Sequence, residues 1–527
     1  MNRVSGIVLM PLLLVVGCHI PLQPYRLRQP AIVVPPATDK APTMAKSDPE
    51  KACVDASTPI CLAFVEVDDM GEPYSRGELN TALAAIRRAN REAAEHPGTA
   101  DPLVVTFVHG WKNNAAEDNG NVAGFKVALQ ELYRRFSGSR HIIGIYIGWR
   151  GNLIRKSFPV AQQFSYFNRE ATAARIPGAT LSSALTQIAA RTHENKRALA
   201  VFIGHSFGGL LLERAVSEAM ASQIAQATIY TQEANALPEG SPEAEEKRRL
   251  AASVTDARAD LVIFINPAGA ATEAKQMLDF LTENGYRYQP GVQRSAAAPA
   301  SPSAVDNLAD RPLLVSVTST GDLATRVAVP IGHALPALGF KMAGSFRDLS
   351  DKPNGHYELS CFDPHRDHPY WDLRTKEEGA VAQSSFYMNT APHMPVLQSH
   401  EMLKAISGTQ MQVASTGQKI TIHNPRAIAE CNRELLNEEG LRIVSTFRLA
   451  DTQTCFAIEE RPNRCNGSPY WLMEIDPDVV PDHSTIFTQR FIQFLIDTFF
   501  TNRNGQPLQR VEPELMQTRQ PASAAAQ

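Results

Sequence analysis

The chain has 527 residues, of which 43% are hydrophobic and 20% charged, and its formal net charge is -4. This length allows one large domain with insertions or a few smaller domains, and the composition predicts a packed core. The charge is too balanced for a basic nucleic-acid-binding surface or a polybasic membrane patch, so we expect no nucleic acid among the partners.

The N-terminus has the pattern of an export signal. Arg3 supplies a positive start, and the apolar run at 4–16 is too short to span a bilayer as a permanent helix. Gly17 and Cys18 at its end resemble the lipobox of bacterial lipoproteins, which implies cleavage before Cys18 and lipidation of that residue. The resemblance predicts a protein anchored to a membrane by lipid in the bacterial cell envelope, in the outer membrane or the periplasm. An ordinary signal peptide or an uncleaved anchor is the alternative.

The other cysteines agree with export. The chain has seven cysteines in total, and those left after Cys18 form an even set, which suggests disulfides in an oxidising compartment. These candidates are Cys53, Cys61, Cys361, Cys431, Cys455 and Cys465. The first two and the last two lie close enough in sequence to pair as local loops, which leaves the middle two, although other connectivities stay open.

Strand and helix patterns alternate along most of the chain, which predicts parallel strands joined by crossover helices. The expected class is therefore α/β, with a mostly parallel central sheet flanked by helices. Strands are expected at 61–67, 103–108, 142–149, 199–203, 261–265, 313–318 and 470–475. Helices are expected at 79–94, 125–136, 181–190, directly after 206, and at 484–500, where Ser484 is a candidate N-cap.

The alternation is lost between 333 and 468, and we interpret this stretch as an insertion before the last strand, with the role of a lid. Residues 19–60 are rich in proline and polar residues, which is typical of a flexible tether. The predicted organisation is a signal peptide (1–18), a tether (19–60), the first part of the core (61–332), the insertion or lid (333–468), the last part of the core (469–501) and a loose tail (502–527).

The most informative motif is Gly204-His205-Ser206-Phe207-Gly208, which follows a buried-type strand pattern and precedes an apolar helix pattern. A strand, a tight turn and a helix in this order are typical of a nucleophile elbow. A serine hydroxyl is a poor nucleophile by itself, and the sharp turn lifts it off the strand end so that a base can reach it. The alternative is an incidental strand–helix turn.

A serine nucleophile needs a histidine base and a carboxylate that orients this base. Enzymes with this elbow carry the acid after the nucleophile and the histidine last, both at the carboxyl ends of parallel strands. Asp322 follows the strand pattern at 313–318, and His483 follows the last strand pattern. The other histidines considered precede the nucleophile or the last strand: His109, His205, His333, His356, His393, His400 and His423. Among the other aspartates, Asp310 lies before its strand, at the wrong end of the sheet, Asp279 lies in a helix pattern and Asp482 in a turn pattern.

A second loop completes the pattern. His109-Gly110-Trp111 follows the strand pattern at 103–108, and a loop that begins His-Gly here often supplies a backbone N–H to an oxyanion hole. Together with the elbow, Asp322 and His483, this loop resembles the serine α/β-hydrolases, and more narrowly bacterial esterase- and lipase-like lipoproteins. The resemblance implies that the N–H groups of Trp111 and Phe207 form the oxyanion hole. The long gap between Asp322 and His483 departs from the compact members of that family.

The resemblance implies the α/β-hydrolase fold and the hydrolysis of carboxylic esters, lipids among them, through an acyl-enzyme. The same residues would also serve an acyltransferase, an amidase or a thioesterase. A non-catalytic surface lipoprotein that uses the fold as a binding scaffold is a further alternative. No cofactor is expected.

One run of side chains is a candidate metal site. Asp363, His365, Asp367 and His368 are dense enough to bind an ion. Arg366 in the middle of the run and the lack of a helical frame favour a polar loop, so we expect no metal site.

Overall fold

The structure is a computed structural model that describes residues 24–36, 60–96, 100–136, 139–152, 166–269, 271–283, 312–319, 321–322, 387–390, 442–448, 455–460, 470–475, 479–501 and 507–508. The predicted signal peptide and the lipidation of Cys18 lie outside these residues, as does the 363–368 run.

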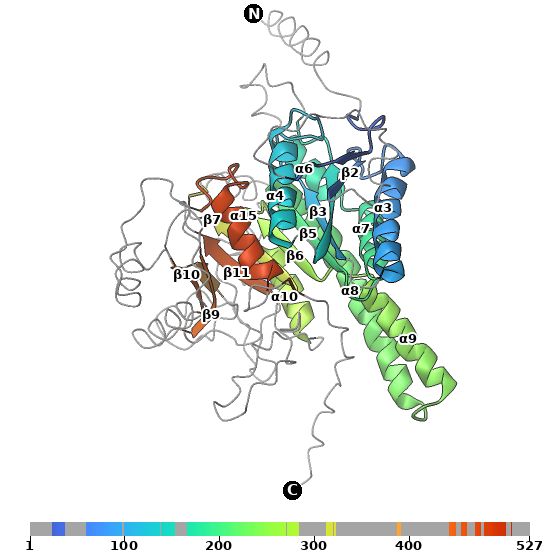
Figure 1. The fold of residues 1–527 in the computed structure, drawn as a ribbon. Coiled ribbons are helices and arrows are strands. Elements are labelled where there is room, and N and C mark those ends of the chain that lie inside the picture. The colour runs from blue at the N-terminus through green and yellow to red at the C-terminus, as the bar shows by residue number, and fades with distance from the viewer. Residues whose placement is uncertain are drawn as a thin grey trace, which may run out of the picture.

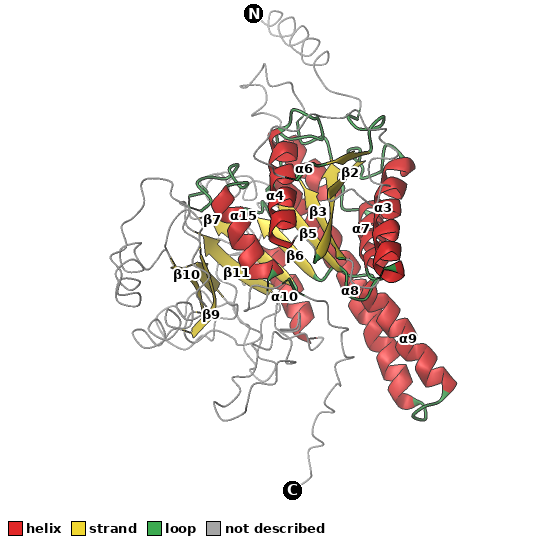
Figure 2. Cartoon of the chain, in the orientation of Figure 1, coloured by secondary structure: helices red, strands yellow, loops and turns green. Residues whose placement is uncertain are grey.

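Seven parallel strands form the centre of the structure (Figures 1 and 2). Their order in the sheet is β2-β4-β3-β5-β6-β7-β11. Helices cover both faces, so the predicted α/β class with a mostly parallel, helix-flanked sheet is confirmed. The strands are β2 (Ile60–Glu66), β3 (Asp101–Val108), β4 (Arg140–Gly148), β5 (Leu199–His205), β6 (Leu261–Ile265), β7 (Leu314–Ser319) and β11 (Tyr470–Ile475).

Further strands extend this sheet at both edges. β1 (Ala31–Val33) pairs antiparallel with β2, so the prediction of a flexible tether over 19–60 is wrong for this segment. At the other edge β8 (Tyr387–Thr390) pairs with β11, and β10 (Cys455–Glu460) lies between β8 and β9 (Arg442–Arg448). These strands come from the predicted insertion and continue the central sheet. The rest of 333–468 lies outside the described residues, so its role as a lid stays a prediction.

The central strands are apolar throughout because both faces of the sheet are buried. Successive side chains of a strand point to opposite faces. In β3, Val104 and Val108 pack into one core cluster, and Val105 and Phe107 pack into the other. The first cluster is covered by α3 (Arg76–Glu95), α6 (Tyr166–Arg175), α7 (Ala179–Thr192), α8 (Phe207–Ala236) and α10 (Ala271–Glu283), and the second by α4 (Gly120–Phe136), α15 (Gln489–Leu495) and the π-helix η4 (Ile496–Phe500).

The helix that follows the elbow is longer than its core contacts require. The second half of α8 and α9 (Pro242–Asp256) form a hairpin that projects away from the sheet (Figure 1). Ser241 caps α9 by accepting a hydrogen bond from the N–H of Ala244, and Lys247 forms an ion pair with Glu233 of α8. Within the described ranges, every helix is too short or too polar to span a lipid bilayer.

The last helix begins later than the sequence predicts. Ser484 is not its N-cap, because the Asp482 carboxylate accepts the N–H groups of Ser484 and Thr485 at 2.7 and 2.9 Å and forms a separate turn. Thr488 caps α15 instead, and its hydroxyl accepts the N–H of Phe491 at 3.0 Å. The residues between the turn and the helix cross over an apolar pocket.

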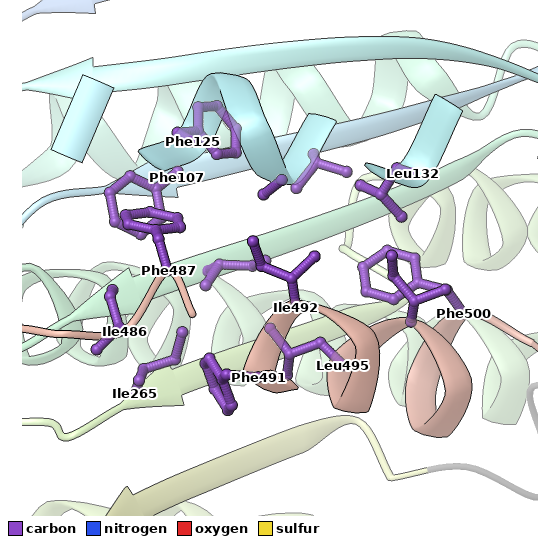
Figure 3. Close-up of a pocket in the computed structure, with 14 residues that line it drawn as sticks. Phe107, Phe125, Leu132, Ile265, Ile486, Phe487, Phe491, Ile492, Leu495 and Phe500 are labelled. Atoms are coloured by element: carbon purple, nitrogen blue, oxygen red, sulfur yellow. The ribbon is translucent and has the colours of Figure 1, made fainter. Parts of the chain in front are cut away.

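This pocket of about 40 Å³ lies between α4, α15, η4 and the sheet (Figure 3). Phe487 stands at one end, with its ring 5.3 Å from that of Phe107, and Gly124 on α4 leaves the space that the Phe487 ring occupies. The loop before α15 is thus anchored in the core. Because the lining offers no polar partner to a water, we expect the pocket to be dry. The lining residues are Val105, Phe107, Phe125, Ala128, Leu132, Ile203, Ile265, Ile486, Phe487, Phe491, Ile492, Leu495, Ile496 and Phe500.

Two buried carboxyl groups lie where the N-terminal segment meets the sheet. Glu66 Oε1 accepts the backbone N–H groups of Tyr25 and Arg26 at 2.7 and 2.5 Å, and Glu78 Oε2 accepts the N–H of Glu66 at 2.8 Å. Burial raises the pKa of Glu66, and burial together with the nearby Glu66 raises the pKa of Glu78 to about 7. Glu78, which is 1% exposed, therefore keeps its proton in the folded state at mildly acidic pH.

This shift makes stability depend on pH in a direction that Glu78→Gln tests. Between about pH 4.5 and 7 the folded state holds a proton that the unfolded state has lost, so the wild-type protein loses stability as pH rises through this window. Glutamine does not titrate. We expect the free energy of unfolding of the variant, minus that of the wild type, to rise by roughly 2–3 kcal/mol from pH 5 to pH 8. Denaturant titration measures it, with exposed Glu95→Gln on the same helix as control. A difference that stays constant with pH would contradict the assignment.

Candidate active site

Ser206 occupies the turn between β5 and α8 in a conformation that side chains rarely adopt. Its φ and ψ are 57° and -125°, which costs about 1–3 kcal/mol for a residue with a Cβ. Two backbone hydrogen bonds hold the turn: the Ser206 N–H donates to Ile265 O at 3.0 Å, and the Ala268 N–H donates to Ser206 O at 3.2 Å. The end of β6 therefore fixes the elbow, which stands at the carboxyl edge of the sheet.

The glycines around Ser206 are required by close backbone approaches. A Cβ on Gly204 would lie 2.7 Å from Gly208 O, and a Cβ on Gly208 would overlap the carbonyl oxygens of Val108 and His109. A Cβ on Gly110 would lie 2.7 Å from the Ser206 Cβ. The elbow and the His-Gly loop are thus packed directly against each other.

Gly208→Ala tests this packing. The added methyl group meets backbone oxygens that cannot rotate away, so we expect a loss of about 2 kcal/mol or more in the free energy of unfolding. Gly120→Ala is the matched control, because a Cβ there at the start of α4 meets nothing within 4 Å. Its stability should stay within about 0.5 kcal/mol of the wild type. Equal effects of the two substitutions in chemical denaturation would refute the close approach.

Two hydrogen bonds join Ser206, His483 and Asp322. Ser206 Oγ lies 2.6 Å from His483 Nε2, and His483 Nδ1 lies 2.8 Å from Asp322 Oδ2. An ionised carboxylate can only accept, so Nδ1 carries the proton and Nε2 is free to accept the serine hydroxyl. Asp322 is 0% exposed and Ser206 5%, while the His483 side chain is 22% exposed. The structure brings together the three residues that the sequence analysis selected.

The loops that carry Asp322 and His483 are tied to each other and to the elbow. Ser319 at the end of β7 donates its hydroxyl hydrogen to Val480 O at 2.5 Å and accepts the N–H of Gly321 at 3.0 Å. Asn266, directly after β6, and His205, directly before Ser206, both contact the backbone of the His483 loop. The position of the imidazole therefore depends on contacts beyond its two hydrogen bonds to Ser206 and Asp322.

His109 organises the loop beside the elbow. It is fully buried, and burial lowers its pKa to about 4, so the ring is neutral near pH 7. Its Nε2 accepts the N–H of Trp149 at 3.0 Å, so the proton lies on Nδ1, which donates to Gly110 O at 2.9 Å. The Trp149 indole N–H donates to His109 O at 2.6 Å. The Gly110–Trp111 peptide is thus held by a hydrogen bond from a neutral histidine.

Aromatic rings line the same side of the elbow. The Trp111 ring lies 5.3 Å from Tyr166 of α6 and 6.4 Å from Phe207, measured between centroids. The Lys112 ammonium lies 4.1 Å over the Trp111 ring, and Lys112 has a positive φ of 65°. Trp111 and Phe207, the two predicted oxyanion donors, are therefore neighbours of Ser206. The donor role of their N–H groups stays a prediction.

Several residues at the site were missed by the sequence analysis. Asn266 was assigned no role, His205 was considered only as a rejected base, and Trp149 only ended an expected strand. Their contacts join segments that are far apart in the chain, and no local pattern reports such contacts. The sequence offered one signal for them, the asparagine at position 266 directly after a buried strand. Asparagine is among the few residues that accept a positive φ, and the φ of Asn266 is 43°.

The cysteine predictions are tested at one position. Cys61 on β2 takes part in a disulfide. Its predicted pairing with Cys53, and the pairings of Cys361, Cys431, Cys455 and Cys465, lie outside the described residues or concern side chains that are not described. Within the described ranges, no group of histidine, cysteine, aspartate or glutamate side chains has the arrangement of a metal site.

No known protein-family model matches the chain, and no curated protein matches it significantly. The function must therefore be inferred from the geometry around Ser206.

Proposed function

We propose that the protein is a serine hydrolase that cleaves carboxylic esters through an acyl-enzyme. The observation that carries the proposal is the continuous hydrogen-bonded relay from Ser206 Oγ through His483 to the buried Asp322. A nucleophile, a base within hydrogen-bond reach and a carboxylate that orients the base are the requirements of this chemistry. The strained elbow supports it further, because backbone strain of this kind concentrates at functional sites.

In the proposed reaction, the Ser206 oxygen attacks the ester carbonyl while His483 Nε2 takes the hydroxyl proton. Asp322 holds the tautomer and stabilises the imidazolium that forms. The carbonyl oxygen becomes an oxyanion, stabilised by the N–H groups of Trp111 and Phe207, each worth about 3–4 kcal/mol of the barrier. Collapse of this intermediate breaks the ester bond, and His483 protonates the leaving alcohol. Water, activated by His483, then releases the acid and regenerates Ser206.

We also propose that the chain has the α/β-hydrolase fold, with 333–468 as an insertion that acts as a lid. The parallel sheet, the elbow at the carboxyl end of β5 and the chain order Ser206, Asp322, His483 support this assignment. The position of Asp322 after β7 and of His483 after β11 agrees with the rule that catalytic groups lie at the carboxyl edge of a parallel sheet.

The proposal extends to the location of the enzyme. Lipidation of Cys18 would anchor it to a membrane of the bacterial envelope, in the outer membrane or facing the periplasm. An ester substrate from lipid would then be close at hand. The disulfide at Cys61 supports a compartment that is oxidising.

Ser206→Ala and Asp322→Asn test the proposed reaction with detergent-solubilised, full-length protein. We expect wild-type protein to react with a fluorophosphonate probe and to hydrolyse p-nitrophenyl esters. Ser206→Ala should abolish labelling and lower kcat by about 10⁴-fold or more, because the nucleophile is lost. Asp322→Asn should lower kcat by about 10³–10⁴-fold, because an amide favours the wrong imidazole tautomer.

Ser222→Ala is the matched control, since this serine is exposed on α8, away from the elbow, and its loss should leave labelling and kcat unchanged. A series of acyl lengths would separate short-chain esters from lipids. A wild-type protein that is folded, yet neither labels nor turns over any ester, would contradict the proposal and favour a non-catalytic binding scaffold.

A further inference from the structure

We infer that His205 and Asn266 are positioning residues, which set the place of the His483 imidazole by holding the backbone of its loop. The inference rests on the proposed function, because it assigns these residues a role in the reaction at Ser206. Both side chains contact the carbonyl oxygen of His483. Both act through the main chain of the residue that carries the base.

The hydrogen bond from His205 has a fixed direction. His205 Nε2 lies 2.7 Å from His483 O, and a carbonyl can only accept, so Nε2 carries the proton. The residue is 3% exposed, and burial, with a smaller contribution from His483, lowers its pKa to about 3. The ring is therefore neutral, and its Nδ1 is left without a hydrogen-bond partner among the described residues.

The neutral state of His205 matters for the proposed reaction. The centroids of the His205 and His483 rings are 5.2 Å apart. His483 becomes an imidazolium when it takes the serine proton, and a second positive charge at this distance would oppose that step. A neutral donor holds the loop without this electrostatic cost, so a buried histidine is better suited here than a lysine or an arginine.

Asn266 makes the second connection. Its Nδ2 lies 3.3 Å from His483 O and 3.4 Å from Asp482 O, and its Oδ1 accepts the N–H of Ser319 at 2.8 Å. The residue is fully buried, and its φ of 43° is one of only three positive values at non-glycine residues in the described part of the chain. One side chain thus joins the end of β7, which precedes Asp322, to the loop of His483.

The carbonyl oxygen of His483 therefore accepts hydrogen bonds from two residues that adjoin other parts of the site. His205 precedes the nucleophile in the chain, and Asn266 follows the strand whose Ile265 O accepts the Ser206 N–H. A displacement of about 1 Å at a reacting group can cost about 10²-fold in rate. Loss of either donor should move the base relative to Ser206 while leaving the substrate-binding surface in place.

The test compares His205→Leu, which removes the donor, with His205→Gln, which keeps an amide N–H at a similar reach. Asn266→Gly removes the second donor and tolerates the positive φ. We expect His205→Leu and Asn266→Gly to lower kcat for a p-nitrophenyl ester by about 10–10²-fold with little change in KM, and to slow fluorophosphonate labelling in parallel. His205→Gln should recover most of the activity.

A matched control and a spectroscopic signal distinguish a positioning role of these residues from a purely structural one. His193→Gln removes a buried histidine that bonds Asp256 O and Asp260 Oδ2 at the opposite end of the sheet, so it should lower thermal stability without lowering kcat. The proton on His483 Nδ1, shared with Asp322, gives a downfield proton resonance in NMR. We expect this resonance to weaken in His205→Leu and to persist in His205→Gln.

The resonance also keeps this inference distinct from the proposed function, because it reports the position of His483 whether or not any ester is cleaved. An inactive wild type with the expected pattern of resonances would overturn the hydrolase and keep the positioning role. Unchanged kcat, labelling and resonance in folded His205→Leu and Asn266→Gly would overturn the inference. Equal losses in His205→Gln and His205→Leu would also overturn it, and if His205→Leu does not fold, Asn266→Gly decides.

Discussion

The site depends on one strained turn, in which Ser206 is held at a φ of 57° between β5 and α8. Such a conformation persists only when its surroundings over-determine it. Backbone hydrogen bonds to the end of β6 and contacts with Gly110 supply that constraint, and Gly204 and Gly208 leave the space that it needs. The contacts that hold the strained turn thus come from residues at the ends of parallel strands, which the sheet fixes relative to one another.

A second constraint is the cost of burying polar groups. Asp322, Asn266 and Ser319 are each 0% exposed, where an unsatisfied polar atom costs about 1–3 kcal/mol. Hydrogen bonds between loops avoid this cost. Asn266 bonds to the backbone of Ser319 and to the His483 carbonyl, the Ser319 hydroxyl bonds to the Val480 carbonyl, and Asp322 bonds to the His483 imidazole. A network of this kind has one low-energy arrangement, and that arrangement fixes the distances between the loops.

Much of this could be predicted from sequence where the signal is local. The central strands, the elbow, Asp322 and His483 follow from apolar runs, glycine spacing and chain order. The pairing of β1 with β2 was missed because a three-residue strand in a proline-rich segment has no recognisable period. Ser484 was wrongly selected as a helix cap because the turn made by Asp482 and the packing of the Phe487 ring against Phe107 decide where α15 begins. Neither is visible in helix propensity.

The separation of Asp322 and His483 by 161 residues has a simple structural basis. β7 and β11 are adjacent and parallel, with Leu314 opposite Tyr470 and Ser319 opposite Ile475. Residues just beyond two such strands must emerge at the same edge of the sheet, whatever lies between them in sequence. Loop closure entropy grows only slowly with length, so a long segment can be inserted there at small cost. The site is therefore fixed by strand pairing, and the intervening segment is free to take a role of its own.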